Sequence, residues 1–395
     1  MDGLPRVSAA LIVRDESAFI ESCLHSLVDT VDEIVIVDTG SRDNTIEIAR
    51  RFPTQLYHFP WRDDFSAARN YALARAKGDW ILYIDADECL EIPSHDVFRA
   101  VLADQAKVAW ELQFYPRVGW TRCYEMRLFR NDPRIRFRGV IHERIHPAVE
   151  AVARSDGLTI GSCDVTLRHF GYEADQSAKN SRNIPLLRKY LADEPDRLYC
   201  WWHLGECYRL AHEHDAAIGA WTNGISRLLA MEADWRQLAD SSLYLSLIKL
   251  RHARGEEVEA LTREALSMFP ESLALQWVGA LAALNRGEMD VAVPVFERLI
   301  AIDADTFCDE KLSYDKALFR HLSADPLALC HFRSGRFLDA ARLYEHAAQS
   351  APDPAPALLK ARLARLRALD QSRPSSGRSV GMADQASEPS PAMPF

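Results

Sequence analysis

The sequence lacks three features that would place the protein in a specialised class. No stretch of its 395 residues approaches the roughly 18 apolar residues that cross a membrane. Its eight cysteines are scattered without a Cys-x-x-Cys pair, which excludes a zinc ribbon and a small disulfide scaffold and predicts reduced thiols. The first residues reach Arg14 and Asp15 after a short apolar run, without the charged-then-apolar order of a signal peptide. We therefore expect a cytoplasmic protein.

An excess of positive charge is also missing. Lysine and arginine number 47 against 57 aspartates and glutamates, which gives a formal net charge of −10. A dedicated nucleic-acid-binding protein would show a basic balance or stripe, so we expect no nucleic-acid partner. Hydrophobic residues make up 48% of the chain, which is ample for a core, and the length predicts two or three domains at roughly 150 residues each.

The first part of the chain alternates short apolar runs with segments of helical period. Residues 7–13 and 33–37 are expected to be buried parallel strands, because neither run alternates with polar residues. Between them, residues 17–28 are expected to form a helix with Ser17 as its N-cap. Further along we expect a helix after Asn44, a strand at 55–59, a helix at 66–77, a strand at 80–84, and hairpin-like strands from about 110 to 168. Strand–helix–strand alternation of this kind predicts a doubly wound α/β sheet.

The second part of the chain is expected to be helical and repetitive. Trp201-x-x-Leu204-Gly205-x-x-Tyr208, followed by Ala217 and Trp221, fits the tetratricopeptide pattern of alternating large and small positions. A later copy carries the same internal spacings at Ala328, Ala340, Tyr344, Ala347 and Pro352. A non-repetitive helical bundle is the alternative. The expected organisation is a first domain at 1–175, a connecting helix or linker at 176–197, repeats at 198–368 and a disordered tail at 369–395.

Acidic residues follow directly after one of the expected strands. Asp85, Asp87 and Glu88 come after the apolar run 80–84, and ligands of open α/β sheets gather beyond the carboxyl ends of strands. If the extended geometry persists, Asp85 and Asp87 point the same way and can address one cation. Oxygen ligands of this kind suit Mg²⁺ or Mn²⁺. A solvated acidic turn is the alternative.

Two further segments place polar side chains near the same edge. Asp38 lies at the end of the expected strand before it and could accept a hydrogen bond from a base N–H. The alternative for this segment is a capped turn in which Asp43 or Asn44 starts the next helix. Arg69 stands on an otherwise apolar helix opening and could meet a diphosphate or a carboxylate. A structural salt bridge is the alternative for Arg69.

The string His142-Glu143-x-x-His146 matches a zinc-protease motif, which requires both histidines on one helical turn. The alternation of apolar and polar residues over 135–145, between Gly139 and Pro147, instead predicts a strand, with the two histidines about 13 Å apart. Alternatively, the charged residues of this strand face solvent and have no catalytic role.

Together these segments resemble family 2 glycosyltransferases of the GT-A fold over about residues 6–172. Ser8–Glu16 is similar to the opening strand of that family, which commonly ends in Lys-Asn-Glu; here it ends in Arg14-Asp15-Glu16 and departs at the middle residue. The resemblance implies a nucleotide-sugar site built from these residues: Arg14, Glu16, Asp38 as the uracil contact, Asp43, Arg69 and Asp85. It further implies metal binding by Asp87, with Asp85 and a late histidine, His169; a packed, hydrogen-bonded histidine is the alternative at that position. Glu143 is the expected base, with His142 contacting acceptor or phosphate.

The resemblance implies a Rossmann-like, doubly wound mixed sheet followed by an all-α tetratricopeptide-like repeat domain. It also implies an inverting transfer of sugar from a nucleotide-sugar donor, such as a UDP-sugar, to a hydroxyl, with Mn²⁺ or Mg²⁺ and no covalent enzyme intermediate. Such enzymes serve cell-envelope glycan synthesis, so a glycan or lipid-linked glycan is the expected acceptor, with a protein or peptide as the alternative. The repeats offer a surface for a partner protein, and a non-catalytic scaffold is the second alternative. The negative net charge predicts at most weak contact with the inner membrane face.

Overall fold

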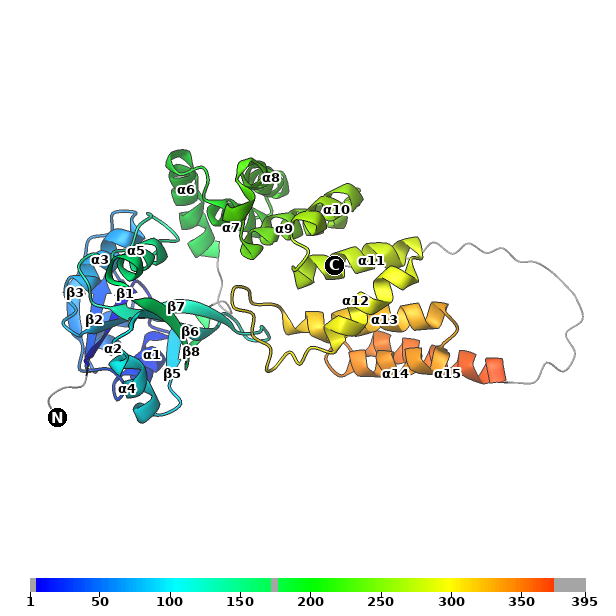
Figure 1. Cartoon of the computed structure of the whole chain (residues 1–395), viewed down its shortest axis with the longest axis horizontal. Helices are drawn as coiled ribbons and strands as arrows, with labels where there is room; N and C mark the ends of the chain where they lie inside the picture. The colour runs from blue at the N-terminus through cyan, green and yellow to red at the C-terminus, as the bar shows by residue number, and fades with distance from the viewer. Residues whose placement is uncertain (1–4, 172–176, 373–395) are drawn as a thin grey trace, which may run out of the picture. The chain divides into compact units, whose positions relative to one another are not determined.

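The computed structural model describes residues 5–171 and 177–372, and Figure 1 shows the order of their helices and strands. The chain divides into two compact units. The first holds residues 1–230 together with the short segment Cys308–Ser313, and the second holds Met231–Phe307 and the residues from Tyr314 onward. The change from strands to helices falls near the expected residue 175, whereas the compact units divide later, because helices α6, α7 and α8 belong with the sheet.

The first unit is built on one eight-stranded sheet in the order β3-β2-β1-β4-β7-β6-β8-β5. Strands β1 to β4 are parallel to one another, β7 is antiparallel to β4 and β6, and β8 runs parallel to β6. The strands are β1 (Val7–Val13), β2 (Glu33–Asp38), β3 (Gln55–His58), β4 (Trp80–Tyr83), β5 (Glu88–Glu91), β6 (Lys107–Tyr115), β7 (Cys123–Arg130) and β8 (Thr159–His169). The expected mixed, doubly wound sheet is confirmed.

Helices cover both faces of this sheet. The helices are α1 (Ile20–Leu27), α2 (Thr45–Ala49), α3 (Phe65–Leu73), α4 (His95–Ala103) and α5 (His146–Asp156). Successive residues of a strand point to opposite faces, so Leu11 packs in a core with α1, α2 and α4, whereas Ala10 packs in a core with α3 and α5. Each core is closed by apolar side chains that exclude water from the parallel strands.

One local expectation is wrong. Ser17 does not cap α1, which starts at Ile20 without a side-chain cap; the backbone N–H of Ser17 instead donates to Asp43 at 3.0 Å. The segment 110–168 is rich in strands, as expected, and α5 lies between β7 and β8. Its proline at the first helical turn and Gly157 in the left-handed region (φ 67°) at its end are ordinary helix boundaries.

Three helices complete the first unit: α6 (Ser177–Asp193), α7 (Leu198–Leu210) and α8 (His214–Ala230). The tetratricopeptide-like pairing is clear between α7 and α8. A Cβ atom added at Gly205 would lie 2.1 Å from Nε1 of Trp221, so only glycine lets the indole pack this closely. The same indole N–H donates to the carbonyl of Trp202 at 3.1 Å, which satisfies its one polar atom.

The second unit is helical throughout its described residues. Its elements are η2 (Ala233–Trp235), η3 (Leu238–Asp240), α9 (Ser241–Ala253), α10 (Glu259–Met268), α11 (Leu273–Arg286), α12 (Met289–Ile300), η4 (Lys316–Phe319), α13 (His321–Arg333), α14 (Phe337–Ala348) and α15 (Ala355–Ser372). Ala328, Ala340, Tyr344 and Ala347 are buried between α13, α14 and α15, as their repeat spacing predicts. The expected tail begins inside α15, which continues to Ser372; the rest of the tail, 373–395, lies outside the described residues.

The eight cysteines are free, as expected from their spacing. No helix within the described ranges combines the length and hydropathy needed to cross a bilayer.

Candidate active site

The strand order brings the expected polar segments to one edge of the sheet. β1 lies between β2 and β4, with Val13 beside Asp38 and Ala10 beside Tyr83, so the carboxyl ends of the three strands are neighbours. The residues that follow these ends are Arg14 to Glu16, Asp38 to Asp43 and Asp85 to Glu88. This edge is where open α/β sheets bind ligands.

The loops after β1 and β2 are pinned to each other by hydrogen bonds. Asp43 accepts from the backbone N–H groups of Ser17 and Thr45, each at 3.0 Å, and Asp15 accepts from that of Arg42 at 2.6 Å. Partial burial would raise the pKa of Asp43, but the hydrogen bonds from Thr45 and Ser17 outweigh it and lower that pKa to about 2. Asp43 therefore links the loops after β1 and β2.

Asp38 occupies the end of β2 with a largely buried side chain, 14% exposed. Its Oδ1 accepts from the backbone N–H of Ser41 at 2.9 Å, and its Oδ2 lies 3.4 Å from Nδ1 of the exposed His58. Gly40 in the same turn has φ 113°, and a Cβ added there would meet no atom within 4 Å. A carboxylate has several acceptor positions, so the contact with Ser41 leaves Asp38 able to accept from a ligand.

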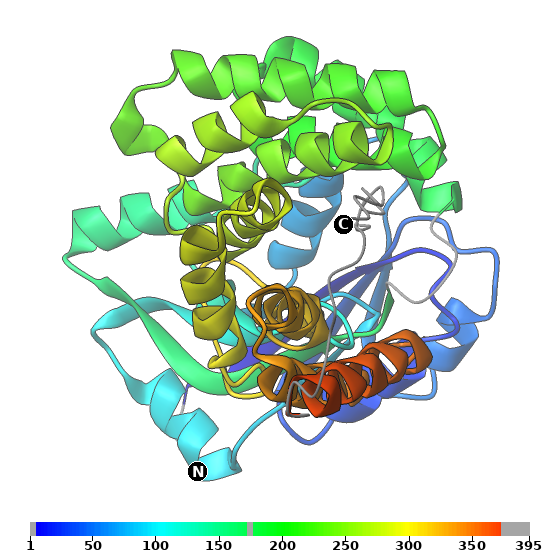
Figure 2. The same ribbon diagram turned by 90° about the vertical axis from the view of Figure 1, so that its right-hand side faces the viewer.

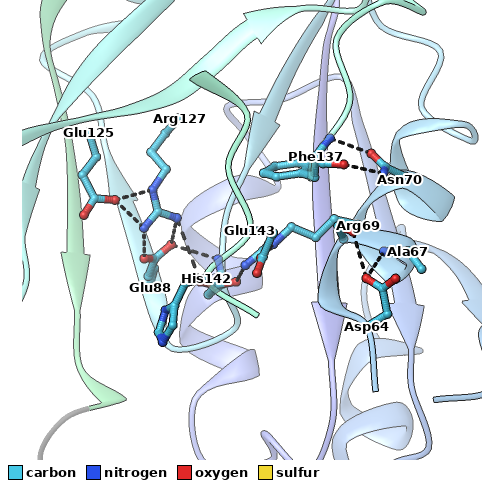
Figure 3. A network of polar contacts seen from close by, with 12 residues as sticks. Asp64, Ala67, Arg69, Asn70, Glu88, Glu125, Arg127, Phe137, His142 and Glu143 are labelled. Atoms are coloured by element: carbon cyan, nitrogen blue, oxygen red, sulfur yellow. Dashed lines mark hydrogen bonds and ion pairs between the residues drawn. The ribbon is translucent and has the colours of Figure 1, made fainter. Parts of the chain in front are cut away.

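Arg69 links two of the expected site carboxylates. Helix α3 is fixed at its start by Asp64, which accepts from the backbone N–H of Ala67 at 2.9 Å (Figure 3). One turn later, Arg69 donates from Nη2 to Oδ1 of Asp85 at 2.8 Å and from Nε to Oε1 of Glu143. Its Nη1 is buried and has no hydrogen-bond partner within the described residues. Arg69 therefore forms the salt bridge that was the alternative, and its Nη1 is not used by any described residue.

The guanidinium of Arg69 is held between aromatic rings. Its Cζ lies 5.1 Å from the ring centre of Tyr83 and 5.6 Å from that of Phe137. Burial would raise the pKa of Asp85, but the charges of Arg69 and of Arg127 outweigh burial and hold that pKa below its usual value. Asp85 is thus ionised, with its negative charge directed toward arginine.

A second arginine lies deeper, and the sequence did not indicate it. Arg127 of β7 forms two hydrogen bonds with Glu88, Nη1 to Oε2 at 3.0 Å and Nη2 to Oε1 at 2.8 Å, and its Nε donates to Glu125 at 2.9 Å (Figure 3). Glu88 also accepts from the backbone N–H of Asp85 at 2.9 Å. Burial raises the pKa of Glu88 to about 7, although Arg127 opposes this shift. The pair fixes the turn that carries Asp85 and Asp87.

That turn corrects the assumption behind the metal prediction. The backbone N–H of Glu88 donates to the carbonyl of Asp85 at 3.1 Å, so residues 85–88 form a turn rather than an extension of β4. Asp85 is directed to Arg69, whereas Asp87 is directed to His169. The two aspartates therefore do not share one face as an extended segment would require.

Asp87 and His169 form the other half of the site. Strands β5 and β8 pair Glu88 with His169, which brings Oδ2 of Asp87 to 3.3 Å from Nε2 of the imidazole. Nδ1 of His169 lies 3.1 Å from the carbonyl oxygen of Pro116 and donates to it, so Nε2 faces the aspartate. Burial alone would lower the pKa of His169, but the hydrogen bond and charge of Asp87 outweigh it and raise that pKa.

The space around Asp87 has room for no side chain at residue 171. A Cβ added at Gly171 would lie 2.0 Å from Oδ2 of Asp87, so only glycine lets the backbone pack against this carboxylate. A carboxylate oxygen and an imidazole nitrogen at this separation are a donor set that Mn²⁺ accepts. Within the described residues no three acidic, histidine or cysteine side chains come together as a complete metal cluster. A cation here would need ligands from its substrate.

His142 and Glu143 are adjacent in the sequence, but their side chains contact different residues. Residues 139–143 form no strand: Gly139 has φ 107° and His142 has φ 50°, so the expected alternation is broken by two left-handed residues. Helix α5 begins only at His146, which leaves the histidines without the shared helical turn of a zinc protease. Both the strand prediction and the zinc-protease alternative are therefore wrong.

The two side chains point to different surroundings. The ring of His142 packs 4.1 Å from that of His203 and 5.0 Å from that of Tyr199, both on α7. Burial lowers the pKa of His142 far enough to keep the ring neutral, and its buried Nε2 has no hydrogen-bond partner among the described residues. Glu143 instead reaches the strand edge through Arg69, with a side chain that is 9% exposed.

Helix α6 adds a residue that the sequence did not identify. Arg182 lies close enough to Arg14 and Glu16 for their charges to affect it: burial and the charge of Arg14 lower the pKa of Arg182, whereas Glu16 opposes that shift. Its guanidinium lies 5.3 Å from the ring centre of Phe65. Two arginines near the end of β1 create a positive field there. The sequence carried no signal for Arg182, since an arginine on a polar helix is commonplace.

Comparison with known proteins identifies this part of the chain. Residues 8–138 match the family described as glycosyl transferase family 2. The N-terminal part of the chain is a family 2 glycosyl transferase domain. The matched range includes β1 to β4 and the acidic turn after β4.

Relatives of the domain continue into the helices. The chain is 39% identical over 210 residues to the TPR repeat-containing protein Synpcc7942_0270 of Synechococcus elongatus. The aligned region covers 51% of this chain and 52% of the relative. It is 27% identical over 264 residues to the SPbeta prophage-derived glycosyltransferase SunS of Bacillus subtilis, covering 62% of this chain and 59% of the relative. The chain thus spans between half and three fifths of the length of these curated relatives.

Among solved structures, the chain is similar to the mannosyltransferase PcManGT of Pyrobaculum calidifontis in complex with GDP-Man and Mn²⁺. The identity is 19% and the TM-score 0.38, covering 70% of this chain and 88% of the other. A second similar structure is S. aureus TarS 1–349, at 14% identity and a TM-score of 0.36, covering 66% of this chain and 91% of the other.

Proposed function

We propose that this chain is an inverting, metal-dependent glycosyltransferase that moves a sugar from a UDP-sugar to a hydroxyl acceptor. The observation that carries this proposal is the pair of charged contacts beyond the carboxyl end of β4, Arg69 with Asp85 and Asp87 with His169. Arg69, Asp85 and Asp87 lie within the residues that match family 2. A repeat scaffold without catalysis has no need for buried charges at a strand edge, because burying them costs free energy.

The metal ion would be held by Asp87 and His169, with phosphate oxygens of the donor and water completing its coordination. This assignment is supported by the 3.3 Å separation of the two ligand atoms. Mn²⁺ or Mg²⁺ bound there would supply positive charge to the leaving diphosphate. Asp85 would act from the neighbouring position, toward the ribose or the water around the metal.

Arg69 and Glu143 would connect donor binding to the activation of the acceptor. The buried Nη1 of Arg69 has a hydrogen to donate, and a diphosphate is a stronger partner for it than water. When Arg69 turns toward the diphosphate, its hold on Glu143 weakens. The carboxylate of Glu143 would then be available to accept the proton of the attacking hydroxyl, in a single displacement without a covalent intermediate. The neutral ring of His142, packed against α7, would hold the segment that carries Glu143 in place.

Asp38 is the proposed contact to the uracil N–H. Replacing Asp38 with Ala is expected to weaken UDP binding by about 10- to 100-fold, because a buried hydrogen bond to a charged acceptor is lost. Binding of GDP should change much less, since a purine presents a different edge. Titration calorimetry of both nucleotides in the presence of Mn²⁺ measures this difference. Equal losses for UDP and GDP would show that Asp38 only holds its turn.

Release of UDP from a panel of sugar nucleotides tests the activity itself. One donor is expected to be hydrolysed slowly without acceptor, and only with Mn²⁺ or Mg²⁺ present. The variant Asp96→Asn should release UDP at the wild-type rate, because Asp96 is an exposed carboxylate of the same domain. The absence of hydrolysis with every donor and both metals would favour the alternative of a binding scaffold.

For the acceptor we propose a glycan or lipid-linked glycan of the cell envelope, with the enzyme acting in the cytoplasm or at the inner face of the membrane. One observation favours the alternative of a protein or peptide acceptor. Helices α6, α7 and α8 enclose a groove of about 450 Å³ lined by Trp201, Leu204, Tyr208, Gly219 and Asn223, among others. An aromatic groove with an amide side chain suits an extended peptide.

Filling the groove separates the two acceptors. A Cβ added at Gly219 meets no atom within 4 Å, so Gly219→Tyr places a ring in the groove without displacing the fold. If the acceptor is a peptide bound there, transfer to it should fall by about tenfold or more while donor hydrolysis is unchanged. Full transfer in Gly219→Tyr would assign the acceptor to another surface. Truncation before α7 would be less informative, because His142 packs against that helix.

A further inference from the structure

The last described helix, α15, presents its large apolar side chains to solvent. Leu358, Leu359, Leu363, Leu366 and Leu369 are between 49% and 70% exposed. The spacing of four and three residues from Leu359 to Leu363 and Leu366 places them on one side of the helix. In Figures 1 and 2, α15 is the orange-red helix that lies along α14. We call the side formed by these five residues the leucine face.

The opposite side of the same helix is buried and consists of small residues. Ala357, Ala361 and Ala364 are at most 6% exposed and pack against alanines of α13 and α14 and against Tyr344. A helix that closes a repeat array usually has a polar outer face. Here the small apolar residues face inward and the large ones outward, which is the reverse of a closing helix. The leucine face is therefore built to contact something else.

The charges on α15 indicate the chemistry of that contact. The helix carries Lys360, Arg362, Arg365 and Arg367 against the single acidic residue Asp370, although the whole chain has a net charge of −10. Lys360 and Arg365 pair with Asp325 at 2.8 Å and Glu345 at 2.7 Å, which ties the flanks of the helix to its unit. Arg362 and Arg367 are exposed beside the leucines. Exposed leucines can enter the acyl–headgroup boundary of a membrane while neighbouring arginines extend to the lipid headgroups.

We propose that α15 binds the surface of an anionic membrane, with the leucine face in the acyl–headgroup boundary and Arg362 and Arg367 on lipid phosphates. The long arginine side chains can extend from the apolar region to the headgroups. A second copy of the chain fits the same face less well, because pairing two α15 helices would bring their basic residues together. The sequence did not indicate this face, because its arginines are spread through an alanine- and leucine-rich segment with no basic cluster.

Vesicle cosedimentation with the full chain tests the proposal independently of sugar transfer. The probes are vesicles of phosphatidylglycerol with phosphatidylethanolamine, and vesicles of phosphatidylcholine alone. Wild-type protein should bind the anionic vesicles at least tenfold more tightly and should dissociate as salt is raised. The double variant Leu359→Ser/Leu363→Ser and the double variant Arg362→Gln/Arg367→Gln should each bind at least about tenfold more weakly.

The control is Leu338→Ser, which removes a leucine that is 54% exposed on α14 and should leave binding unchanged. Far-ultraviolet circular dichroism and melting temperature verify that each variant is folded. Absence of binding to anionic vesicles by folded wild-type protein would overturn the proposal. It would equally be overturned if the wild type were a dimer that the leucine variant converts to a monomer, with no vesicle binding by either. UDP release in solution should be unaffected in all of these variants, so failure here leaves the proposed activity standing.

Discussion

Replacing Asp87 with Asn is expected to lower kcat/KM for sugar transfer by about a thousandfold while the protein stays folded. The substitution removes a negative charge from the proposed metal ligand but changes little volume, and Asn can still hydrogen-bond His169. Loss of the cation would remove several kcal/mol of stabilisation from the charge that develops on the leaving diphosphate. The rate of UDP release from the identified donor, with saturating Mn²⁺, measures the loss.

Two comparisons make this experiment specific. Asp96→Asn, an exposed carboxylate on α4, should transfer at the wild-type rate. Wild-type enzyme in EDTA should fall to the level of Asp87→Asn, and added metal should restore the wild type alone. Undiminished transfer by Asp87→Asn, or by the wild type in EDTA, would contradict the metal assignment.

Replacing Arg127 with Met is expected to destabilise the sheet by about 3–5 kcal/mol, because it leaves the buried carboxyl group of Glu88 without its partner. Both side chains are nearly inaccessible, at 7% and 1% exposure. Because the chain has two compact units, a single unfolding free energy would mix them. Hydrogen exchange of the β4 and β7 amides reports the local effect.

A second substitution distinguishes a buried ion pair from simple packing. Adding Glu88→Gln to Arg127→Met should recover part of the lost stability, since the uncompensated carboxylate is removed. The control is Arg134→Met; Arg134 is 49% exposed and pairs with Asp132, so its loss should cost less than about 1 kcal/mol. If the double variant were less protected than Arg127→Met, the charge of Glu88 would not be the cause.

Local periodicity predicted the parts of the fold in which each strand buries both of its faces. The runs 7–13 and 33–37 became β1 and β2, and the acids at 38, 85 and 87 came to one edge because parallel strands align their carboxyl ends. The repeat pattern, which includes Gly205 and Trp221, likewise agrees with the close pairing of α7 with α8, in which these two residues are in contact.

The failures arise where long-range contacts decide the conformation. Alternation over 135–145 predicted a strand, but the segment instead turns at Gly139 and His142, and a Cβ at Gly139 would lie 2.8 Å from Oη of Tyr190 on α6. The partner of Arg127 is 39 residues away, so nothing near Arg127 in the sequence marks it as buried. Asp85 and Asp87 diverge because Glu88 closes a turn, and the pairing of Glu88 with Arg127 helps to hold that turn.

The most direct test of the account is a thermal-shift titration of wild-type protein with UDP, Mn²⁺, and both together. Anything that binds the folded state alone raises the melting temperature, and the rise grows with the ratio of ligand concentration to Kd, so a site shared by metal and diphosphate responds to the pair. The account predicts a clear rise with UDP plus Mn²⁺, little change with either alone, and no rise for Asp87→Asn. A shift with UDP alone that Mn²⁺ does not increase, or no shift at millimolar UDP with Mn²⁺, would contradict it.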